Sequence, residues 1–286
     1  MAKSTGLYDS DQYYDSDGQA SRLAPSLNGL LYALDWFKAW AFARRLNGLY
    51  TIRPNGAQAR PRVLDVGAGD GKFLYFMRRF GFAPFGTTAS EISQKAAKAR
   101  WGIDLDHSLD VPMRLKTLEV ITYWHVFEHL TDPDGHMASW SRVLGFGGAV
   151  MIEVPNIESV GARLCYDAWL GSDDKHHINH MTTGQIVEMA QRHGFQVVRK
   201  EGFSLKFSYP FMWSALIGRL FGRERYSFDQ VFATLKNPVA RLGKAPFATI
   251  NAVASVIYLA PVIVGLCIWG LLSGRGEVLR LYLKKS

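Results

Sequence analysis

The stretch VLDVGAGDGKFL, residues 63–74, decides the fold class. It begins as a short apolar strand, reaches glycines at Gly67, Gly69 and Gly71, and continues at once into a helical pattern. Glycine tolerates positive φ angles and lets the backbone pass close to a ligand, and the start of a helix offers free N–H groups. The pattern predicts a strand, a ligand-binding loop and a helix, although a glycine loop can also be a purely structural turn.

The alternation of strands and helices continues to about residue 203. LEVITYWH (118–125) and AVMIEVPN (149–156) are apolar and β-branched, as expected of buried strands. Between them, Asp132 is placed to cap a helix and Pro133 occupies its first turn. Strands separated by helices of this kind predict an α/β fold, a doubly wound and mostly parallel sheet with helices on both faces.

Composition narrows the class of protein. The chain has 286 residues, and 48% of them are apolar, which is enough for a large core. The two cysteines, Cys165 and Cys267, exclude a disulfide framework and favour a reducing compartment. The first 19 residues are polar and acidic without an apolar signal core, so we expect the protein to be cytoplasmic.

The sequence HVFEH, residues 125–129, permits two interpretations. On a long helix this spacing is a zinc-peptidase signature. The preceding residues are strand-like, however, and Asp132-Pro133 follows so soon that at most two helical turns fit between. We therefore expect His125 at the end of a strand, at the carboxyl edge of the sheet, where open α/β folds bind ligands.

Asp65 and the G-x-G-x-G loop that follows it resemble motif I of the class I S-adenosylmethionine-dependent methyltransferases. A dinucleotide loop would place a third glycine at position 72, which is Lys72, so a nicotinamide enzyme is the weaker rival. The segments YWHVFEHLTDP, GFGGAVMIEVPN and HHINHMTTGQIVEMAQRHGF resemble, in order, parts of the sugar, lipid and quinone branch. The resemblance covers about residues 61–203 and implies a seven-stranded sheet and S-adenosylmethionine as the cofactor.

The resemblance also implies a set of cofactor-binding residues. These are Asp65, Gly67, Ala68, Gly69, Gly71, Thr88 and Trp124. The family usually has an acid at the position of Thr88 that binds both ribose hydroxyls, and threonine cannot accept two charged hydrogen bonds. Glu91 is a possible substitute, and otherwise the affinity falls by about 1–3 kcal/mol. A non-catalytic scaffold with a methyltransferase fold is therefore the alternative function.

Three histidines are the candidate catalytic residues. His125 is expected near the transferred methyl group, and His177 and His180, which lie with His176 in a later loop, could take a proton from an acceptor hydroxyl. Relatives with E-x-x-E-H bind a divalent metal, but the first glutamate is replaced here by His125, so no metal is predicted. A structural role for each histidine stays open.

The excess positive charge lies in the last third of the chain. Residues 199–286 contain 13 Lys and Arg against 4 Asp and Glu, and they include the apolar segment 247–272. That segment favours an anionic membrane surface over nucleic acid as the partner. Pro261 interrupts it, and the strand-like GEVLRLYLKKS (276–286) follows, so we expect a helical hairpin in one leaflet and not a span. The alternative is packing on the catalytic domain or a second subunit.

Together these observations predict four segments. Residues 1–60 form an N-terminal extension with a helix, in which Leu34, Phe37 and Trp40 share an apolar face, and 61–203 form the methyltransferase core. Residues 204–274 form a hydrophobic, basic helical insertion that faces the membrane, and 275–286 form the last strand of the sheet. We expect an S-adenosylmethionine-dependent enzyme, peripheral or monotopic at the inner face of the cell membrane, that methylates a small, lipid-linked or glycan acceptor at oxygen.

Overall fold

A computed structural model of the chain describes residues 25–49, 60–112, 114–115, 117–172, 176–204, 206–221 and 258–286. The chain divides into two compact units, which are described separately below. The first unit comprises residues 1–153, 186–199 and 281–286, and the second comprises residues 154–185 and 200–280. The predicted hairpin residues 247–257, and the basic residues between 223 and 244, lie outside the described part of the chain.

The described strands form one seven-stranded sheet with the order β3-β2-β1-β4-β5-β7-β6. Strands β1, β2, β3, β4 and β5 pair in parallel wherever they are neighbours. This confirms the predicted α/β fold. The strands are β1 (Arg62–Val66), β2 (Ala83–Thr88), β3 (Asp106–His107), β4 (Leu118–Trp124), β5 (Leu144–Pro155), β6 (Phe195–Glu201) and β7 (Val278–Lys285).

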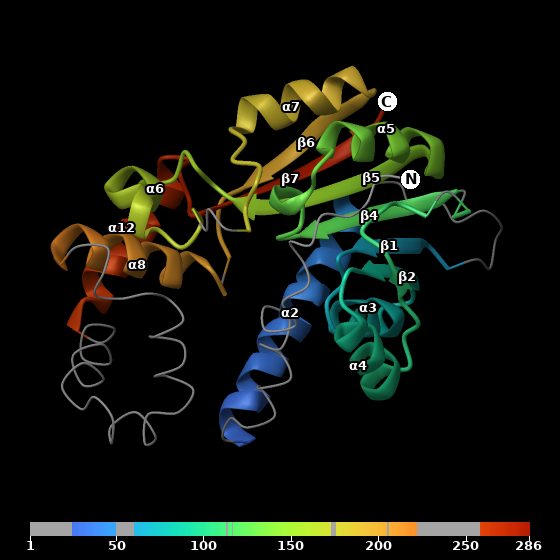
Figure 1. Ribbon diagram of the computed structural model, residues 1–286, viewed down its shortest axis with the longest axis horizontal. Helices are drawn as coiled ribbons and strands as arrows, with labels where there is room; N and C mark the ends of the chain where they lie inside the picture. Colours follow the sequence, from blue (N-terminus) through green and yellow to red (C-terminus); the bar gives the residue numbers. More distant parts are fainter. Residues whose placement is uncertain are drawn as a thin grey trace. The chain divides into compact units, whose positions relative to one another are not determined.

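Helices follow the strands as the sequence predicted, and Figure 1 shows α3 and α4 on one side of the sheet and α5 on the other. Helix α5 begins as expected, because the Asp132 carboxylate accepts a hydrogen bond from the Gly135 N–H and Pro133 occupies the first turn. The α-helices are α2 (Pro25–Leu49), α3 (Lys72–Arg79), α4 (Glu91–Trp101), α5 (Pro133–Val143), α6 (Val160–Cys165), α7 (Thr183–Arg192), α8 (Ser208–Phe221) and α12 (Ala260–Leu272).

Helix α2 exists where it was predicted, but its expected apolar face was wrong. The sequence placed Phe37 on the buried side, and its side chain is 46% exposed. Ala39, Phe42 and Leu46 are buried instead. Phe42 packs in the core cluster of the first unit, and it contacts the ring of Phe73 in α3 at 5.6 Å between centroids. Because α2 is apolar on several sides, helical spacing alone could not select the face that packs.

The second unit is built from helices that the sequence did not resolve individually. Helices α6, α8 and α12 share an apolar cluster with Met212, Trp213 and Ile263 at its centre. At the start of β7, the buried carboxylate of Glu277 accepts hydrogen bonds from the Gly161 N–H at 2.9 Å and from Trp169 Nε1 at 2.8 Å. Burial nevertheless raises the pKa of Glu277 to about 7, because the charged form is poorly solvated there.

Helix α12 begins at Ala260, with Pro261 as its second residue, and the hairpin that the sequence analysis expected around Pro261 lies partly outside the described residues. Pro261 lies in the first turn, where its missing N–H costs nothing because that position has no helical acceptor. The helix has 13 residues, about 20 Å at 1.5 Å per residue. In the described part of the chain, no helix combines the length and the apolar character needed to cross a bilayer.

Strand β7 returns to the sheet in the opposite direction to β6. The Ser286 N–H, after the end of β7, donates to the Gly194 carbonyl before β6. At the other end, Gly276 lies against Gly202, and a Cβ on Gly276 would be 2.0 Å from the Gly202 carbonyl oxygen. Only glycine allows the two backbones to approach this closely.

We predict that Gly276→Ala destabilises the protein by about 1–3 kcal/mol, the usual cost of forcing an extra carbon into a packed site. Gly265→Ala is the control, because a Cβ at this position in α12 meets no atom within 4 Å and alanine favours a helix. Urea unfolding of both variants measures the difference. Equal midpoints for the two would contradict the close approach at Gly276.

Candidate active site

The glycine loop between β1 and α3 has a left-handed backbone at every glycine. The φ angles are +72° at Gly67, +53° at Gly69 and +77° at Gly71. A Cβ on Gly67 would be 2.4 Å from a methyl group of Val126, and one on Gly71 would be 2.9 Å from Ala97. A Cβ on Gly69 would meet no atom within 4 Å. The first and third glycines therefore pack against protein, while the middle one faces open space.

Strand β2 fixes the loop through a residue that the sequence analysis did not name. The Ala68 N–H donates to the Thr87 carbonyl at 2.7 Å, and the Gly67 N–H donates to Thr87 Oγ1 at 3.4 Å. Thr87 is fully buried. The loop conformation is therefore held by its neighbours before any ligand binds, which lowers the entropic cost of binding.

Asp65 lies in β1 beneath this loop and is almost fully buried. Thr122 Oγ1 in β4 donates to its carboxylate at 2.6 Å. Burial raises the pKa of Asp65 to about 7, although the Thr122 hydrogen bond and the positive charge of Lys38 oppose the increase. A carboxylate in such a site favours a nearby cation or hydrogen-bond donor, because either stabilises its charged form.

Thr88 ends β2 as predicted, and its side chain is buried. Its hydroxyl accepts a hydrogen bond from the Ser90 N–H at 3.3 Å. Glu91, the suggested substitute, begins α4, where its exposed side chain pairs with Lys95 at 3.5 Å. The structure thus gives Thr88 a place in the turn after β2, and its part in cofactor binding stays a prediction.

Trp124, the last residue of β4, lies under the N-terminal helix α2. Lys38 Nζ is 3.5 Å from the centroid of the indole ring, a cation–π distance. Phe42 and Phe73 contact the same indole edge-to-face, at 5.7 and 5.4 Å between centroids. Helix α2 therefore places a cation beside the carboxyl end of β4, a contribution that no local sequence pattern indicated.

His125 follows Trp124 with a φ angle of +54°, which is uncommon outside glycine and more frequent for histidine, asparagine and aspartate. Its N–H donates to the Glu153 carbonyl at 2.9 Å. Its ring lies between two carboxylates, with Nε2 3.2 Å from Glu153 and Nδ1 3.4 Å from Glu128. The strained backbone is therefore held by contacts on both sides of the ring, as is common at functional sites.

The two carboxylates shift the pKa of His125. Burial alone would lower the histidine pKa, but Glu128 and Glu153, both themselves buried, outweigh it and raise the pKa above the ordinary value. A ring whose two nitrogens both face buried carboxylates does not fit a proton acceptor for a substrate. It fits a positioning role that holds the end of β4 against the end of β5, and a catalytic role for His125 stays a prediction.

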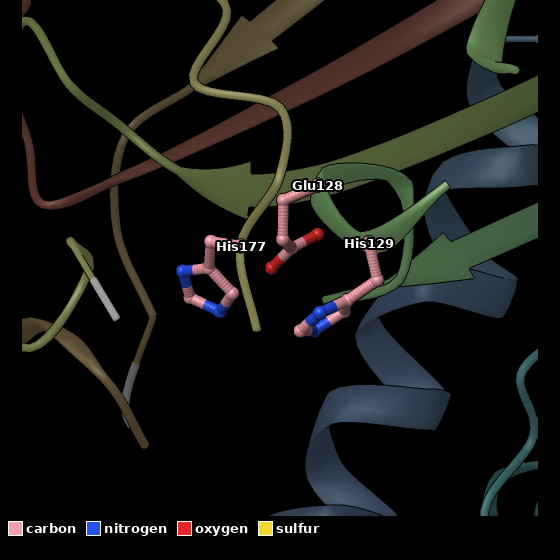
Figure 2. A group of neighbouring side chains, drawn as sticks. All are labelled: Glu128, His129 and His177. Carbon is pink, nitrogen blue, oxygen red and sulfur yellow. The ribbon is translucent and has the colours of Figure 1, made fainter. Parts of the chain in front are cut away.

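The residues after His125 exclude the zinc-peptidase interpretation. Phe127–His129 form a single turn of 3-10 helix, η2, so His125 and His129 are not on one face of a long helix. Figure 2 shows the side chains of Glu128 and His129 leaving this short turn. Both are buried. This turn also brings Val126 against Gly67, so it forms part of the wall of the glycine loop.

His177 and His180 belong to the second unit; Figure 2 also labels His177. The ring of His177 is buried, and its Nδ1 lies 2.9 Å from the Gly171 carbonyl. A carbonyl only accepts, so Nδ1 carries the proton and a neutral His177 has its lone pair on Nε2. The ring of His180 lies 6.1 Å from that of His177 and 5.9 Å from that of Tyr166. A neutral His177 can therefore accept a proton at Nε2, and its catalytic role stays a prediction.

Comparison with known proteins agrees with this geometry. A family described as "Methyltransferase domain" matches residues 29–200. The chain belongs to this family. It is a class I S-adenosylmethionine-dependent methyltransferase, with S-adenosylmethionine as its cofactor.

Individual relatives are distant. The chain is 29% identical over 102 residues to a ubiquinone biosynthesis O-methyltransferase of Brucella anthropi. This matched stretch covers 33% of this chain and 41% of that relative. A putative sarcosine dimethylglycine methyltransferase from Galdieria sulphuraria shares the fold with a TM-score of 0.52 and 16% identity, over 86% of this chain and 82% of that one. A cyclopropane synthase from Mycobacterium tuberculosis does so with a TM-score of 0.51 and 13% identity, over 86% and 83%.

We predict that Gly69→Val abolishes cofactor binding and leaves the protein folded. The valine would project from the open face of the loop, with a backbone cost of about 1–2 kcal/mol for a left-handed non-glycine residue. Gly102→Val is the matched control, because Gly102 has a φ of +61° and also meets nothing within 4 Å, but it ends α4. Calorimetry with S-adenosylhomocysteine compares the affinities of the two variants. An equal loss of binding in both would contradict the prediction.

We predict that Glu153→Gln lowers the pKa of His125, measured by an NMR titration of the ring. The folded-state pKa lies above the unfolded value, so the ion pairs stabilise the fold below about pH 6.5, and this contribution is lost as pH rises through the folded-state pKa. The variant should show a weaker decline in stability over that range. Glu119→Gln is the control, because Glu119 on β4 accepts a hydrogen bond from the Arg62 N–H and not from His125. This variant should leave the His125 titration unchanged.

Proposed function

We propose that the protein transfers a methyl group from S-adenosylmethionine to an oxygen atom of a small acceptor, of the lipid-linked, quinone or glycan kind. The observation that carries the proposal is the glycine loop, whose middle glycine faces open space while its flanks are fixed by Val126 and Thr87. A purely structural turn has no need of an open backbone at its centre. Bound there, S-adenosylmethionine supplies an electrophilic methyl group.

The residues of the first unit fit such a cofactor. Gly69 offers open backbone in the middle of the loop, and the buried Asp65 carries a carboxyl group below it. Lys38 is a cation beside Trp124, suited to a carboxylate such as that of an amino acid. Thr88 supplies one hydroxyl where an acid is usual, so we expect the ribose to be bound less tightly than in relatives with the acid.

Oxygen as the methylated atom is supported by the chemistry of His177. An alcohol or phenol must lose its proton as the methyl group arrives, and a neutral imidazole with its proton on Nδ1 can take it at Nε2. The Gly171 carbonyl holds the ring in this tautomer. We propose His177 as the general base, with His180 beside it as a second candidate.

The acceptor class has two supports. The ordered resemblance of residues 61–203 to the sugar, lipid and quinone branch favours it, and the distant relative in ubiquinone biosynthesis is an O-methyltransferase. Only 41% of the length of that relative is matched. We therefore take from it the type of reaction, O-methylation, and not the identity of the substrate. We propose no nucleic-acid partner and a cytoplasmic location at the inner face of the cell membrane.

The alternative, a scaffold that kept the fold without the reaction, rests on Thr88. Calorimetry with S-adenosylhomocysteine separates the two functions. Micromolar binding supports the enzyme, and no heat up to millimolar concentration supports the scaffold.

The activity itself is tested by incubating the full chain with methyl-labelled S-adenosylmethionine and extracted lipids, quinone precursors and glycolipids. We expect label in an ether or ester, identified by mass spectrometry. His177→Ala should reduce kcat strongly while cofactor affinity is retained, and the activity left in it should rise with pH as the acceptor hydroxyl ionises. Label on nitrogen or carbon, or an unchanged His177→Ala enzyme, would contradict O-methylation by this base.

A further inference from the structure

In the described part of the second unit, helix α12 exposes an apolar face. Its buried positions are Ile263 and Gly270, and Ile263 packs in the cluster with Met212 and Trp213 of α8. The other side of the helix is solvent-exposed and carries no polar side chain between Ala260 and Leu272. The exposed large residues are Val262, Val264, Ile268, Trp269, Leu271 and Leu272.

The exposed fractions are large for side chains of this kind. Trp269 is 54% exposed, Ile268 53% and Leu272 81%. Single exposed apolar residues are normal on protein surfaces, but a contiguous group is typical of an interaction site. Spacings of three, four or seven residues link the six side chains along one short helix, so they form one continuous surface, which we call the α12 face.

Cationic residues stand at both ends of this helix pair. Arg275 is exposed three residues after α12, and Arg219 is exposed in the last turn of α8. Cys267 Sγ of α12 lies 3.5 Å from the Ser208 carbonyl, which places the second half of α12 against the start of α8. Within 206–221 and 258–276 the sequence contains no Asp or Glu. These two helical segments are therefore apolar, with positive charge near their ends.

We propose that the α12 face docks on an anionic lipid bilayer, with the helix in the interfacial plane. Its 13 residues give about 20 Å, short of the roughly 30 Å hydrocarbon core, so it fits an interfacial position and not a span. Trp269 suits the headgroup boundary, where tryptophan is enriched. Arg219 and Arg275 would meet anionic headgroups.

A second copy of the chain is the competing occupant, and charge disfavours it. A symmetric contact through the α12 face brings the same surface of both copies together, so the arginines of one copy approach those of the other. An anionic bilayer instead neutralises these charges and removes the apolar side chains from water. The docking goes beyond the proposed reaction and does not depend on it.

Flotation of the full chain with vesicles tests the proposal. We expect binding to vesicles of phosphatidylcholine mixed with phosphatidylglycerol and much weaker binding to phosphatidylcholine alone. Ile268→Ser with Trp269→Ser should reduce binding at least tenfold, about the effect of losing two buried apolar side chains. Arg219→Glu with Arg275→Glu should reduce binding to the anionic vesicles by about tenfold or more.

Phe146→Ser is the matched control. Phe146 is an equally apolar side chain that is 93% exposed on β5 of the other unit. If vesicle binding came from non-specific contact with any exposed apolar side chain, this variant would lose binding too. Retained binding of S-adenosylhomocysteine shows that each variant is folded. The proposal is overturned if the full chain does not float with anionic vesicles, if Phe146→Ser loses as much binding as the α12 variant, or if Ile268→Ser with Trp269→Ser dissociates a dimer and leaves flotation unchanged.

Discussion

The site depends on one backbone constraint, the left-handed conformation from Gly67 to Gly71 at the carboxyl end of β1. Every neighbour of the loop is arranged around it. Val126 fills the space that a side chain on Gly67 would need, Ala97 does the same for Gly71, and Thr87 accepts hydrogen bonds from the loop. These contacts fix the flanks and leave Gly69 open, so the protein has organised a surface of bare peptide before the cofactor arrives.

Buried carboxyl groups lie at the carboxyl ends of the strands around this loop. Asp65 in β1 bonds Thr122, and Glu153 in β5 contacts the ring and backbone of His125. A buried carboxylate destabilises the fold unless it is paired. Well-packed apolar residues at the same positions would often give equal or greater stability. Their presence at one edge of the sheet is therefore easier to explain by ligand binding and orientation than by stability.

The fold was largely predictable because local patterns in the sequence mark where strands and helices begin and end. The strand ending in glycines, the Asp132-Pro133 start of α5 and the strand-like pattern of residues 276–286 are local signals, and each was correct. The face of α2 was not, because a helix apolar on several sides packs according to its neighbours. Lys38 had no local signal at all, since its contact with Trp124 links residues far apart in the sequence.

Glu153 did have a signal, which the sequence analysis passed over. It is the one charged residue in the run AVMIEVP (149–155), and a charge inside an otherwise apolar strand implies a partner. The partner, His125, was named for its spacing to His129, although its closest relationships are with Glu128 and Glu153. The HVFEH motif thus drew attention to His125, and only the three-dimensional arrangement revealed its two carboxylate neighbours.

The return of β7 also limits what the chain before it can do. Strand β7 lies between β5 and β6 in the sheet. The segment 258–277, which leads into β7, must therefore reach β7 on the side of a membrane where the sheet lies. An apolar helix under this constraint can enter one leaflet and leave it, or pack on protein, but a single crossing would remove β7 from its place. Helix α12 has 13 residues with Pro261 in its first turn, a length that agrees with the position proposed for it in the plane of an interface.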